Sequence, residues 1–324
     1  MSPLVFVKLL AIFSVVAIGW AAAKSGRLGA AEASRVLSGA AFYVFVPALL
    51  FRTTARIDFH RLDVRVVLAF FAPTLALVAV VYTSLRLRAR SGAGAAEPSV
   101  RAITASFGNA VQIGIPLAAA LFGETGLALH LTVVGLHSLT LLTVLTALVE
   151  LDLARERPGE GHAGARLLRT LATTARNTVI HPVVLPVLAG LAWNASGAAL
   201  PGLLDEILAT LGQAVVPVCL VLIGVSLAHY GLRGALRTAT LLSALKLVVH
   251  PLAVLAFARL ALGLSGVPLA IVVMLAALPV GSNALIFAQR YQTLPAETST
   301  AIVVSTLAFV VTAPLWLALL HVAG

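Results

Sequence analysis

Long runs of apolar residues alternate with short polar segments along almost the whole of this 324-residue chain. Most runs have the roughly 20 residues that a helix needs to cross the hydrocarbon core of a bilayer. The alternation typical of strands is absent, and backbone groups in lipid must find their partners within the same helix. The pattern therefore predicts an all-α integral membrane protein with ten transmembrane helices, at residues 3–23, 36–51, 64–85, 100–122, 127–149, 177–193, 207–228, 236–262, 267–287 and 301–322.

The composition supports this class and excludes several others. Hydrophobic residues make up 60% of the chain, charged residues 10%, and the mean hydropathy is +1.05, which is too apolar for a water-soluble protein of this size. The net charge of +10 lies mainly between the apolar segments, so it does not indicate binding to nucleic acid. The single Cys219 excludes an internal disulfide. Because CxxC, GxSxG and HExxH motifs are missing, we expect neither an enzyme nor a bound cofactor or metal.

The positions of the basic residues predict the orientation. Cytoplasmic loops are enriched in Lys and Arg, which favours a periplasmic N-terminus and a periplasmic C-terminus. In that orientation the outer loops carry Arg52, Arg56, Arg61, Arg65 and Arg259, and the inner loops carry Lys24, Arg27, Arg35, Arg86, Arg88, Arg90, Arg101, Arg155, Arg157, Arg166, Arg169, Arg176, Arg233, Arg237 and Arg290. The first segment lacks the basic start and cleavage site of a signal peptide, so we expect it to be a retained span.

The longest polar loop, residues 152–176, is then cytoplasmic and separates two groups of five spans, residues 1–151 and 177–324. These halves resemble each other. "FVPALLF" in the second span matches "VVPVCLV" in the seventh, and "APTLALVA" in the third parallels "HPLAVLAF" in the eighth. An odd number of spans inverts the second half relative to the first. Two inverted five-helix repeats, each with a broken fourth helix, are typical of secondary transporters.

The fourth and ninth spans each carry a break in the middle. In the fourth, Gly114 is expected to unwind the backbone and Pro116 to begin a new half-helix, where its missing N–H costs nothing. In the ninth, Pro279 is expected to begin the corresponding half-helix. In the predicted orientation the two half-helix N-termini meet near the bilayer centre. Each carries a partial positive charge, which favours an anion between them.

Four neutral polar residues accompany these breaks: Asn109, Gln112, Ser282 and Asn283. Their amides and hydroxyls would bind the anion directly, or they would only cap the exposed backbone, and the sequence leaves both roles open for each residue. No Asp or Glu lies in the middle of a span, which disfavours a cation/proton antiporter and proton coupling through a buried acid. Sodium held by backbone carbonyls stays open.

Two lysines lie within spans. Lys246 is about 13 Å inside the eighth span at roughly 1.5 Å per residue, too deep to reach the membrane surface easily. It would attract the anion or neutralise the carbonyl ends of the broken helices. Lys8 is shallower, and we expect its side chain to extend to the interface.

Histidines within the spans raise a redox alternative. His130 and His137 lie seven residues apart on the fifth span, and His181 and His250 each precede a proline. A bis-histidine haem needs facing ligands at one depth on packed helices, and no such pair is evident. Helix packing or pore lining is the expected role of these histidines.

At these motifs the chain resembles the auxin efflux carrier family, in its bacterial branch of organic-anion permeases. The matching pieces, in order, are "PALLF", "GNAVQIGIPLAAALFGETG", "GVSLA", "LKLVVHP", "LPVGSNALIFAQRY" and "STLAFVVTAPLW". The resemblance implies that the fourth and ninth helices cross. It also implies a scaffold of helices 1, 2, 6 and 7 that supports a homodimer, a transport domain of helices 3–5 and 8–10, and elevator-like alternating access.

The sequence therefore predicts a secondary transporter of small organic anions, such as carboxylates, in a bacterial cytoplasmic membrane. The expected partners are the anion, the lipid bilayer and a second copy of the chain. A passive anion channel would use the same helix dipoles and is the first alternative. A sodium-coupled symporter of the related bile-acid symporter type is a less favoured one.

Overall fold

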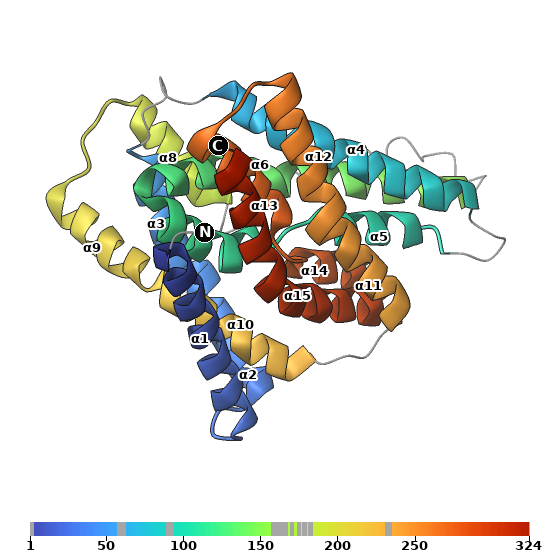
Figure 1. Ribbon diagram of the computed structural model, residues 1–324, viewed down its shortest axis with the longest axis horizontal. Coiled ribbons are helices and arrows are strands. Elements are labelled where there is room, and N and C mark those ends of the chain that lie inside the picture. Colours follow the sequence, from blue (N-terminus) through green and yellow to red (C-terminus); the bar gives the residue numbers. More distant parts are fainter. Residues whose placement is uncertain are drawn as a thin grey trace.

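The computed structural model describes residues 3–56, 63–88, 94–156, 184–230 and 235–323, together with positions 168, 172, 173, 176 and 180. Within these ranges the chain is helical, with one isolated bridge and no strand (Figure 1). The α-helices are α1 (Pro3–Lys24), α2 (Ala30–Ala40), α3 (Val46–Thr54), α4 (Val64–Arg88), α5 (Glu97–Ser106), α6 (Ile115–Glu156), α8 (Val184–Ala195), α9 (Gly202–Gln213), α10 (Val215–Tyr230), α11 (Leu236–Ala244), α12 (His250–Ala256), α13 (Gly266–Ala277), α14 (Ser282–Arg290) and α15 (Pro295–Ala323). Four π-helical turns are η1 (Ala41–Phe45), η3 (Ala110–Gly114), η4 (Leu245–Val249) and η5 (Phe257–Ala261). His181 and most of the predicted 152–176 loop lie outside the described residues.

By length and composition, six helical segments in the described ranges are suited to crossing a membrane: Ala30–Thr54, Val64–Arg88, Ala110–Leu153, Gly202–His229, Leu236–Ala261 and Pro295–Leu320. Three shorter apolar helices are Leu10–Lys24, Val184–Ala195 and Gly266–Ala277. The all-α membrane class is thus confirmed. The predicted fourth span is divided into α5, η3 and the start of α6, and α6 continues into the fifth span past a kink at Gly123 (φ 63°, ψ −159°).

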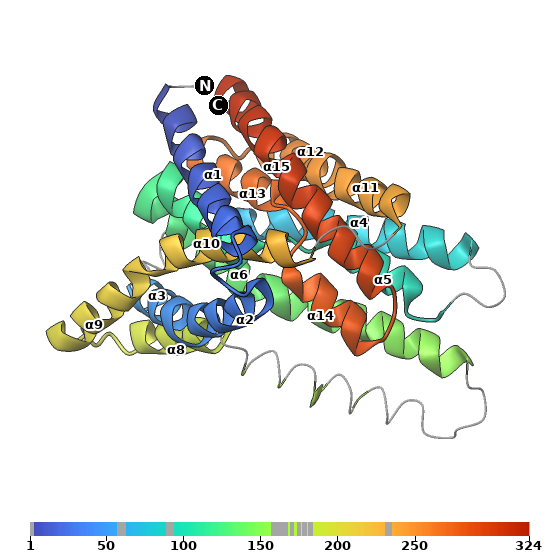
Figure 2. The ribbon, with the colours of Figure 1, turned by 90° about the horizontal axis from the view of Figure 1, so that it is seen from below.

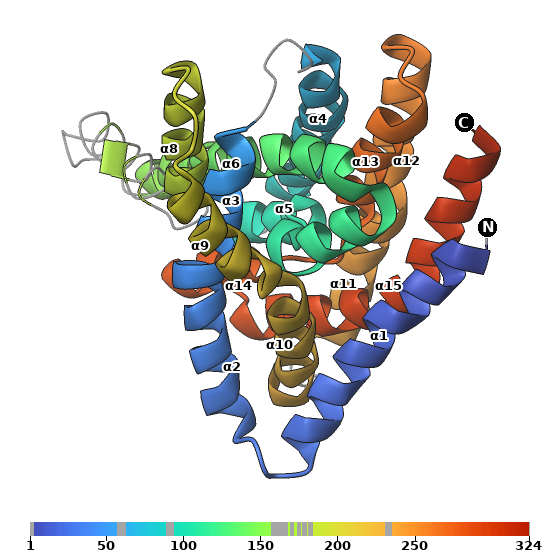
Figure 3. The same cartoon turned by 90° about the vertical axis from the view of Figure 1, so that its left-hand side faces the viewer.

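Ion pairs connect loops that the sequence places on the same side of the membrane. The start of α1 and the end of α15 also lie side by side at one end of the molecule (Figures 2 and 3). The pairs on the predicted outer side are Arg52–Asp205 at 2.8 Å and Arg56–Asp205 at 2.6 Å, and those on the predicted inner side are Arg86–Asp152 at 3.1 Å, Arg101–Glu297 at 2.9 Å and Arg101–Glu97.

Three of the π-helical turns end two residues before a proline: η1 before Pro47, η3 before Pro116 and η4 before Pro251. A proline within a helix lacks the N–H that would bond four residues back, and its ring clashes with that carbonyl. Widening the preceding turn to a five-residue hydrogen bond moves the carbonyl away. The spans therefore continue past these prolines at the cost of carbonyl groups that lose their usual partner.

Two side chains take over such carbonyls. Trp316 donates its indole N–H to the Leu247 carbonyl at 2.8 Å, which is the group that Pro251 cannot bond. His130 Nε2 lies 2.8 Å from the Ala110 carbonyl in the first turn of η3. Because a buried carbonyl without a donor is costly, these two long-range bonds hold α15 and α6 against the π-turns.

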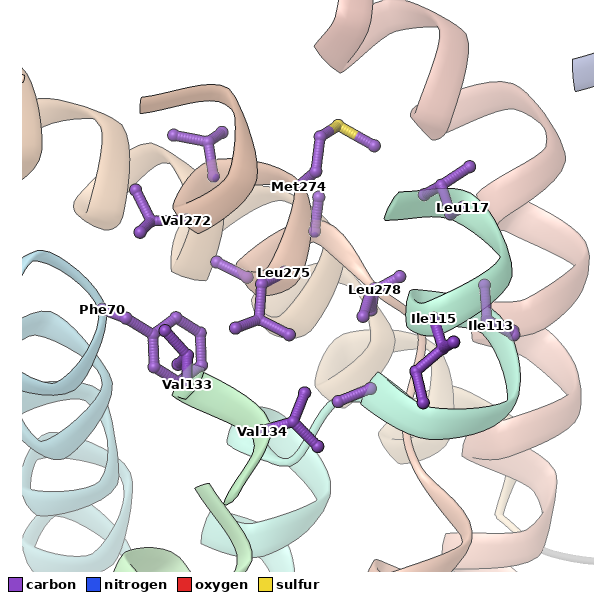
Figure 4. Packing of buried hydrophobic residues seen from close by; sticks show 14 of the residues in the cluster. Phe70, Ile113, Ile115, Leu117, Val133, Val134, Val272, Met274, Leu275 and Leu278 are labelled. Carbon is purple, nitrogen blue, oxygen red and sulfur yellow. The ribbon is translucent and has the colours of Figure 1, made fainter. Parts of the chain in front are cut away.

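Helix α13 is apolar on all sides, and from Ile271 to its end at Ala277 every residue is buried, as expected of a helix end with no face toward water or lipid. Its C-terminal end packs against the start of α6. Figure 4 shows Leu275 and Leu278 between Phe70 of α4 and the side chains of Ile113 and Ile115. The hydrophobic core therefore surrounds both breaks.

Glycines bring two helix pairs into backbone contact. A Cβ on Gly19 would lie 2.4 Å from the Val221 carbonyl oxygen, and one on Gly224 would lie 2.0 Å from that of Val16, so α1 and α10 touch closely. A Cβ on Gly190 would lie 2.0 Å from Thr54 Oγ1, which joins α8 to α3 in the same way. Small residues at such contacts are how membrane helices associate without a hydrophobic driving force.

Replacing Trp316 by Phe should leave the Leu247 carbonyl buried without a donor and lower the free energy of unfolding by about 1–3 kcal/mol. In a Pro251→Ala background residue 251 regains its N–H, so the same replacement should cost about 1 kcal/mol less. Unfolding of the four proteins in detergent micelles measures the difference. An equal loss in both backgrounds would show that Trp316 acts through packing alone.

Candidate functional site

The two predicted breaks lie against each other. Asn109 donates its backbone N–H to the Pro279 carbonyl at 2.8 Å, and Gly281 donates its N–H to the Phe107 carbonyl at 2.9 Å. The result is an isolated antiparallel bridge between two segments far apart in the sequence. A helical segment starts directly after each strand of the bridge, at Ala110 and Ser282. The first N–H groups of both helices, which lack intrahelical acceptors, therefore gather at this point.

This contact depends on the absence of side chains at the bridge. A Cβ on Gly281 would lie 2.7 Å from the Gly108 carbonyl oxygen, a distance at which a neighbouring backbone must move. Gly108 itself has only van der Waals room, with Lys246 Nζ and the Leu275 carbonyl oxygen each 3.4 Å from a Cβ position. The close approach of two backbones thus requires the glycine of "PVGSN", whereas a Cβ on the glycine of "GNAVQ" would make ordinary van der Waals contacts.

The first break lies earlier in the chain than the sequence analysis predicted. Helical backbone resumes at Ala110, so Pro116 is not in the first turn of the new half-helix. Pro116 is accommodated instead by η3, the widened turn before it. Gly114 lies inside that turn, where a Cβ would be 2.6 Å from the His130 ring. Its role is to admit His130, not to unwind the backbone.

Asn109 and Gln112 form a closed pair at the start of this helix. Asn109 Oδ1 accepts the backbone N–H of Gln112 at 3.1 Å, which is an N-cap, and Asn109 Nδ2 donates to Gln112 Oε1 at 3.0 Å. The capping role that the sequence left open is therefore present at Asn109. Gln112 Nε2 has no hydrogen-bond partner in the described part of the chain and remains available to a ligand.

A polar cavity of about 260 Å³ opens beside the bridge. Its lining carries no charged side chain among the described residues. It is closed by α2 and α10 on one side and by the two half-helix starts, α14 and α15 on the other. The lining consists of Ser38, Asn109, Gln112, Ile223, Ser226, Leu227, Ser282, Leu285, Ile286, Gln289, Ile302, Val303 and Thr306.

Three of the seven predicted site residues, Asn109, Gln112 and Ser282, line this polar cavity. Asn283 faces a separate small cavity of about 20 Å³, which it shares with His137, Ser138 and again with Asn109 and Ser282. The prediction that Pro279 begins the second half-helix is wrong: Pro279 is buried beside the bridge, where its carbonyl accepts the Asn109 N–H, and α14 begins three residues later at Ser282. Gly114 and Pro116 do not line the polar cavity.

Both intraspan lysines bond to carbonyls near the ends of half-helices. Lys246 is fully buried, donates to the Ala276 carbonyl at the end of α13, and lies 3.3 Å from His250 Nδ1. Lys8 donates to the Ala120 carbonyl, just before the kink at Gly123. Of the two roles predicted for Lys246, neutralising a carbonyl end is the one the contacts support. The Lys8 ammonium group has a protein acceptor close to the predicted outer loop, and its extension to the interface stays a prediction.

Sequence reasoning missed four polar lining residues: Ser38, Ser226, Gln289 and Thr306. Ser226 and Gln289 lie within the quoted motifs "GVSLA" and "LPVGSNALIFAQRY", which are signals that could have found them. Thr306 likewise lies within the quoted motif "STLAFVVTAPLW", whereas Ser38 is a single hydroxyl residue outside these motifs. No group of three or more His, Cys, Asp or Glu suited to a metal ion occurs among the described residues.

Comparisons with known proteins agree with this picture. The sequence profile of a family described as "Membrane transport protein" matches residues 4–317. An "Uncharacterized transporter" of Methanothermobacter thermautotrophicus is 26% identical over 308 residues, which cover 95% of each chain. A "Putative malonate transporter" of Rhizobium meliloti is 26% identical over 275 residues, 83% of this chain and 82% of that protein.

Replacing Gly281 by Ala should force the two bridge strands apart and lower the free energy of unfolding by about 1–3 kcal/mol, the usual cost of overpacking. The matched control is Gly29→Ala, because no atom lies within 4 Å of a Cβ at that exposed position. Melting temperatures in detergent compare the two variants. If both are as stable as the wild type, the bridge does not hold the two breaks together.

Proposed function

Because the chain belongs to the membrane transport protein family, we propose that it is a secondary transporter that moves small organic anions by alternating access, with the anion bound where the two half-helices begin. The observation that carries this proposal is the polar cavity. It places two helix N-termini and several neutral donors around a space with no acidic lining residue among those described.

The charge distribution around the cavity favours a carboxylate. Each helix start carries a partial positive charge, which favours an anion without a cationic side chain. At the first start Ala110 and Gln112 already donate their backbone N–H groups, to the Gly108 carbonyl and to Asn109 Oδ1. At the second start the N–H groups of Ser282 and Asn283 have no acceptor in the described part of the chain. Gln112 Nε2 and the Ser282 hydroxyl add donors that have no protein partner in the described part of the chain. The similarity to the putative malonate transporter supports a small mono- or dicarboxylate as the substrate class.

The packing of the helices supports two inverted repeats of five spans, at residues 1–151 and 177–324. In the first glycine-mediated contact, span 1 (α1) touches span 7 (α10), and in the second, span 6 (α8) touches span 2 (α3). Exchange of the repeats converts one pair into the other. The breaks in spans 4 and 9 are exchanged in the same way, so the bridge would be the crossing point of the two repeats.

These glycine-mediated pairs support a scaffold of spans 1, 2, 6 and 7, which would also form the homodimer. The polar cavity lies between scaffold helices α2 and α10 and the half-helix starts of the proposed transport domain, spans 3–5 and 8–10. A site at such a boundary is carried past the scaffold when one group slides against the other.

Saturable counterflow of malonate in proteoliposomes tests this carrier. Flux without counterflow would indicate a passive channel, and dependence on a sodium gradient a symporter.

Asn109→Asp gives the sharpest test of the site. Asp caps a helix as well as Asn does, so folding should be retained, but the change places a negative charge on the cavity wall and removes the Nδ2 donor. We expect the affinity for malonate to fall tenfold to a hundredfold, which corresponds to a loss of about 1.5–3 kcal/mol of binding free energy. Asn283→Asp and Gln112→Ala should also weaken binding. Gln292→Glu makes a similar charge change at an exposed position outside the cavity and serves as control. Wild-type affinity in both Asp variants would place the anion elsewhere.

The orientation is tested with single cysteines in a Cys219→Ala background. Gly29 lies in the first loop, predicted to be cytoplasmic, and Ala199 in the loop before α9, predicted to be periplasmic, and both are exposed. A membrane-impermeant maleimide added to intact cells should label Ala199→Cys and not Gly29→Cys. The opposite labelling would reverse the predicted topology. It would also reverse the inward and outward directions assigned to the half-helices.

A further inference from the structure

We propose that His137 binds a proton together with the anion, so that the transporter carries an organic anion and a proton in the same direction. This inference rests on the proposed function and adds the coupling ion to it. It arises from a buried Lys–His cluster on the far side of the bridge from the polar cavity, which anion binding by itself does not use.

His137 has a free ring nitrogen at the binding site. Its side chain is 1% exposed, and Nε2 has no hydrogen-bond partner in the described part of the chain. The ring lines the small cavity, which has space for about one water molecule. Asn109 and Ser282 line both the small cavity and the polar cavity, so a ligand in the polar cavity would be separated from His137 only by these residues.

The other histidines of the cluster each have Nε2 engaged in a hydrogen bond. His250 Nε2 lies 2.8 Å from Thr74 Oγ1, and Thr74 donates its own hydroxyl to the Phe70 carbonyl at 2.5 Å, so His250 must donate at Nε2. Its Nδ1 then accepts from Lys246. His130 Nε2 bonds to the Ala110 carbonyl and must also donate. Of the described histidines around the bridge, His137 is the one whose buried Nε2 has no hydrogen-bond partner.

The charged groups near His137 are all basic. Lys246 and His250 face it from η4 and α12, and His130 lies two turns earlier on its own helix. Phe70 of α4 and Phe107 contribute rings, with centroids 5.5 Å and 4.3 Å from that of His137, and the small-cavity residues of α14 are neutral. No carboxylate balances a second positive charge beside Lys246 in either cavity among the described residues.

A proton on His137 is therefore opposed by Lys246 while the site is empty. An anion at Asn109 and Ser282 supplies the missing negative charge and favours the proton, and the proton in turn favours the anion. The Phe107 ring lies within the distance at which an aromatic ring attracts a cation. In this step a proton from water is taken up by the lone pair of His137 Nε2, and no other bond is formed or broken.

Calorimetric titration of malonate into the purified protein, in two buffers of different ionisation enthalpy, counts the protons exchanged on binding. At a pH where free malonate is fully ionised, the wild type should take up about one proton per anion. His137→Gln should bind malonate more weakly and take up almost none. His229→Gln, at the exposed end of α10, should behave as the wild type does.

Each other result is decisive. Binding by the wild type without proton uptake would overturn the inference and leave the proposed function standing, and this measurement requires no folded variant. Proton uptake that persists in His137→Gln, or in His137→Asn if the first variant does not fold, would place the proton on another group and overturn the inference. Failure of the wild type to bind malonate or any other small carboxylate would overturn the proposed function and the inference with it.

Discussion

A backbone group that loses its helical partner inside a bilayer must find another partner in the protein, because no water is present to replace it. The structure of this chain depends on that constraint. Prolines and two breaks free carbonyl and N–H groups in the middle of the spans, and each freed group that can be traced meets a long-range donor or acceptor. Trp316 bonds to Leu247, His130 to Ala110, and Ser305 Oγ to the Val280 N–H at 3.0 Å. The irregular backbone thus fixes which helices pack together.

The same constraint separates the charges from the cavity. The two intraspan lysines bond to carbonyls near C-terminal helix ends: Lys8 to Ala120, just before the kink at Gly123, and Lys246 to Ala276, at the end of α13 beside the second break. The helix starts at the breaks expose N–H groups and are lined only by neutral side chains. The helix dipole stabilises a cation at the C-terminal, carbonyl end of a helix and an anion at its N-terminus. The backbone therefore sets the electrostatic preference of the cavity, which is for an anion.

The sequence predicted the class, most helix positions and the two breaks, because runs of apolar residues and paired glycine–proline interruptions are local signals. Three of the seven predicted site residues line the polar cavity, because they adjoin the breaks that these local signals locate. The prediction was wrong where a distant partner decides the local geometry. Pro116 did not begin a helix because a π-turn admits it, and Gly114 serves the ring of His130, sixteen residues later. Ser38 and Thr306 join the cavity only through packing of helices far apart in the chain.

A neutral site is also what a carrier requires. An anion held by Arg or Lys in a low-dielectric cavity is difficult to release, because the charge pair is strong and its separation leaves a buried cation. Helix dipoles supply about half a charge each, and amide donors add hydrogen bonds that water readily replaces once the cavity opens. Gln112 Nε2 and the Ser282 hydroxyl meet that description, since neither bonds to the protein in the described residues. Because the cavity wall is divided between helices α2 and α10 and the half-helix starts, the sliding movement of the proposed mechanism would separate the donors from the opposite wall without breaking an ion pair.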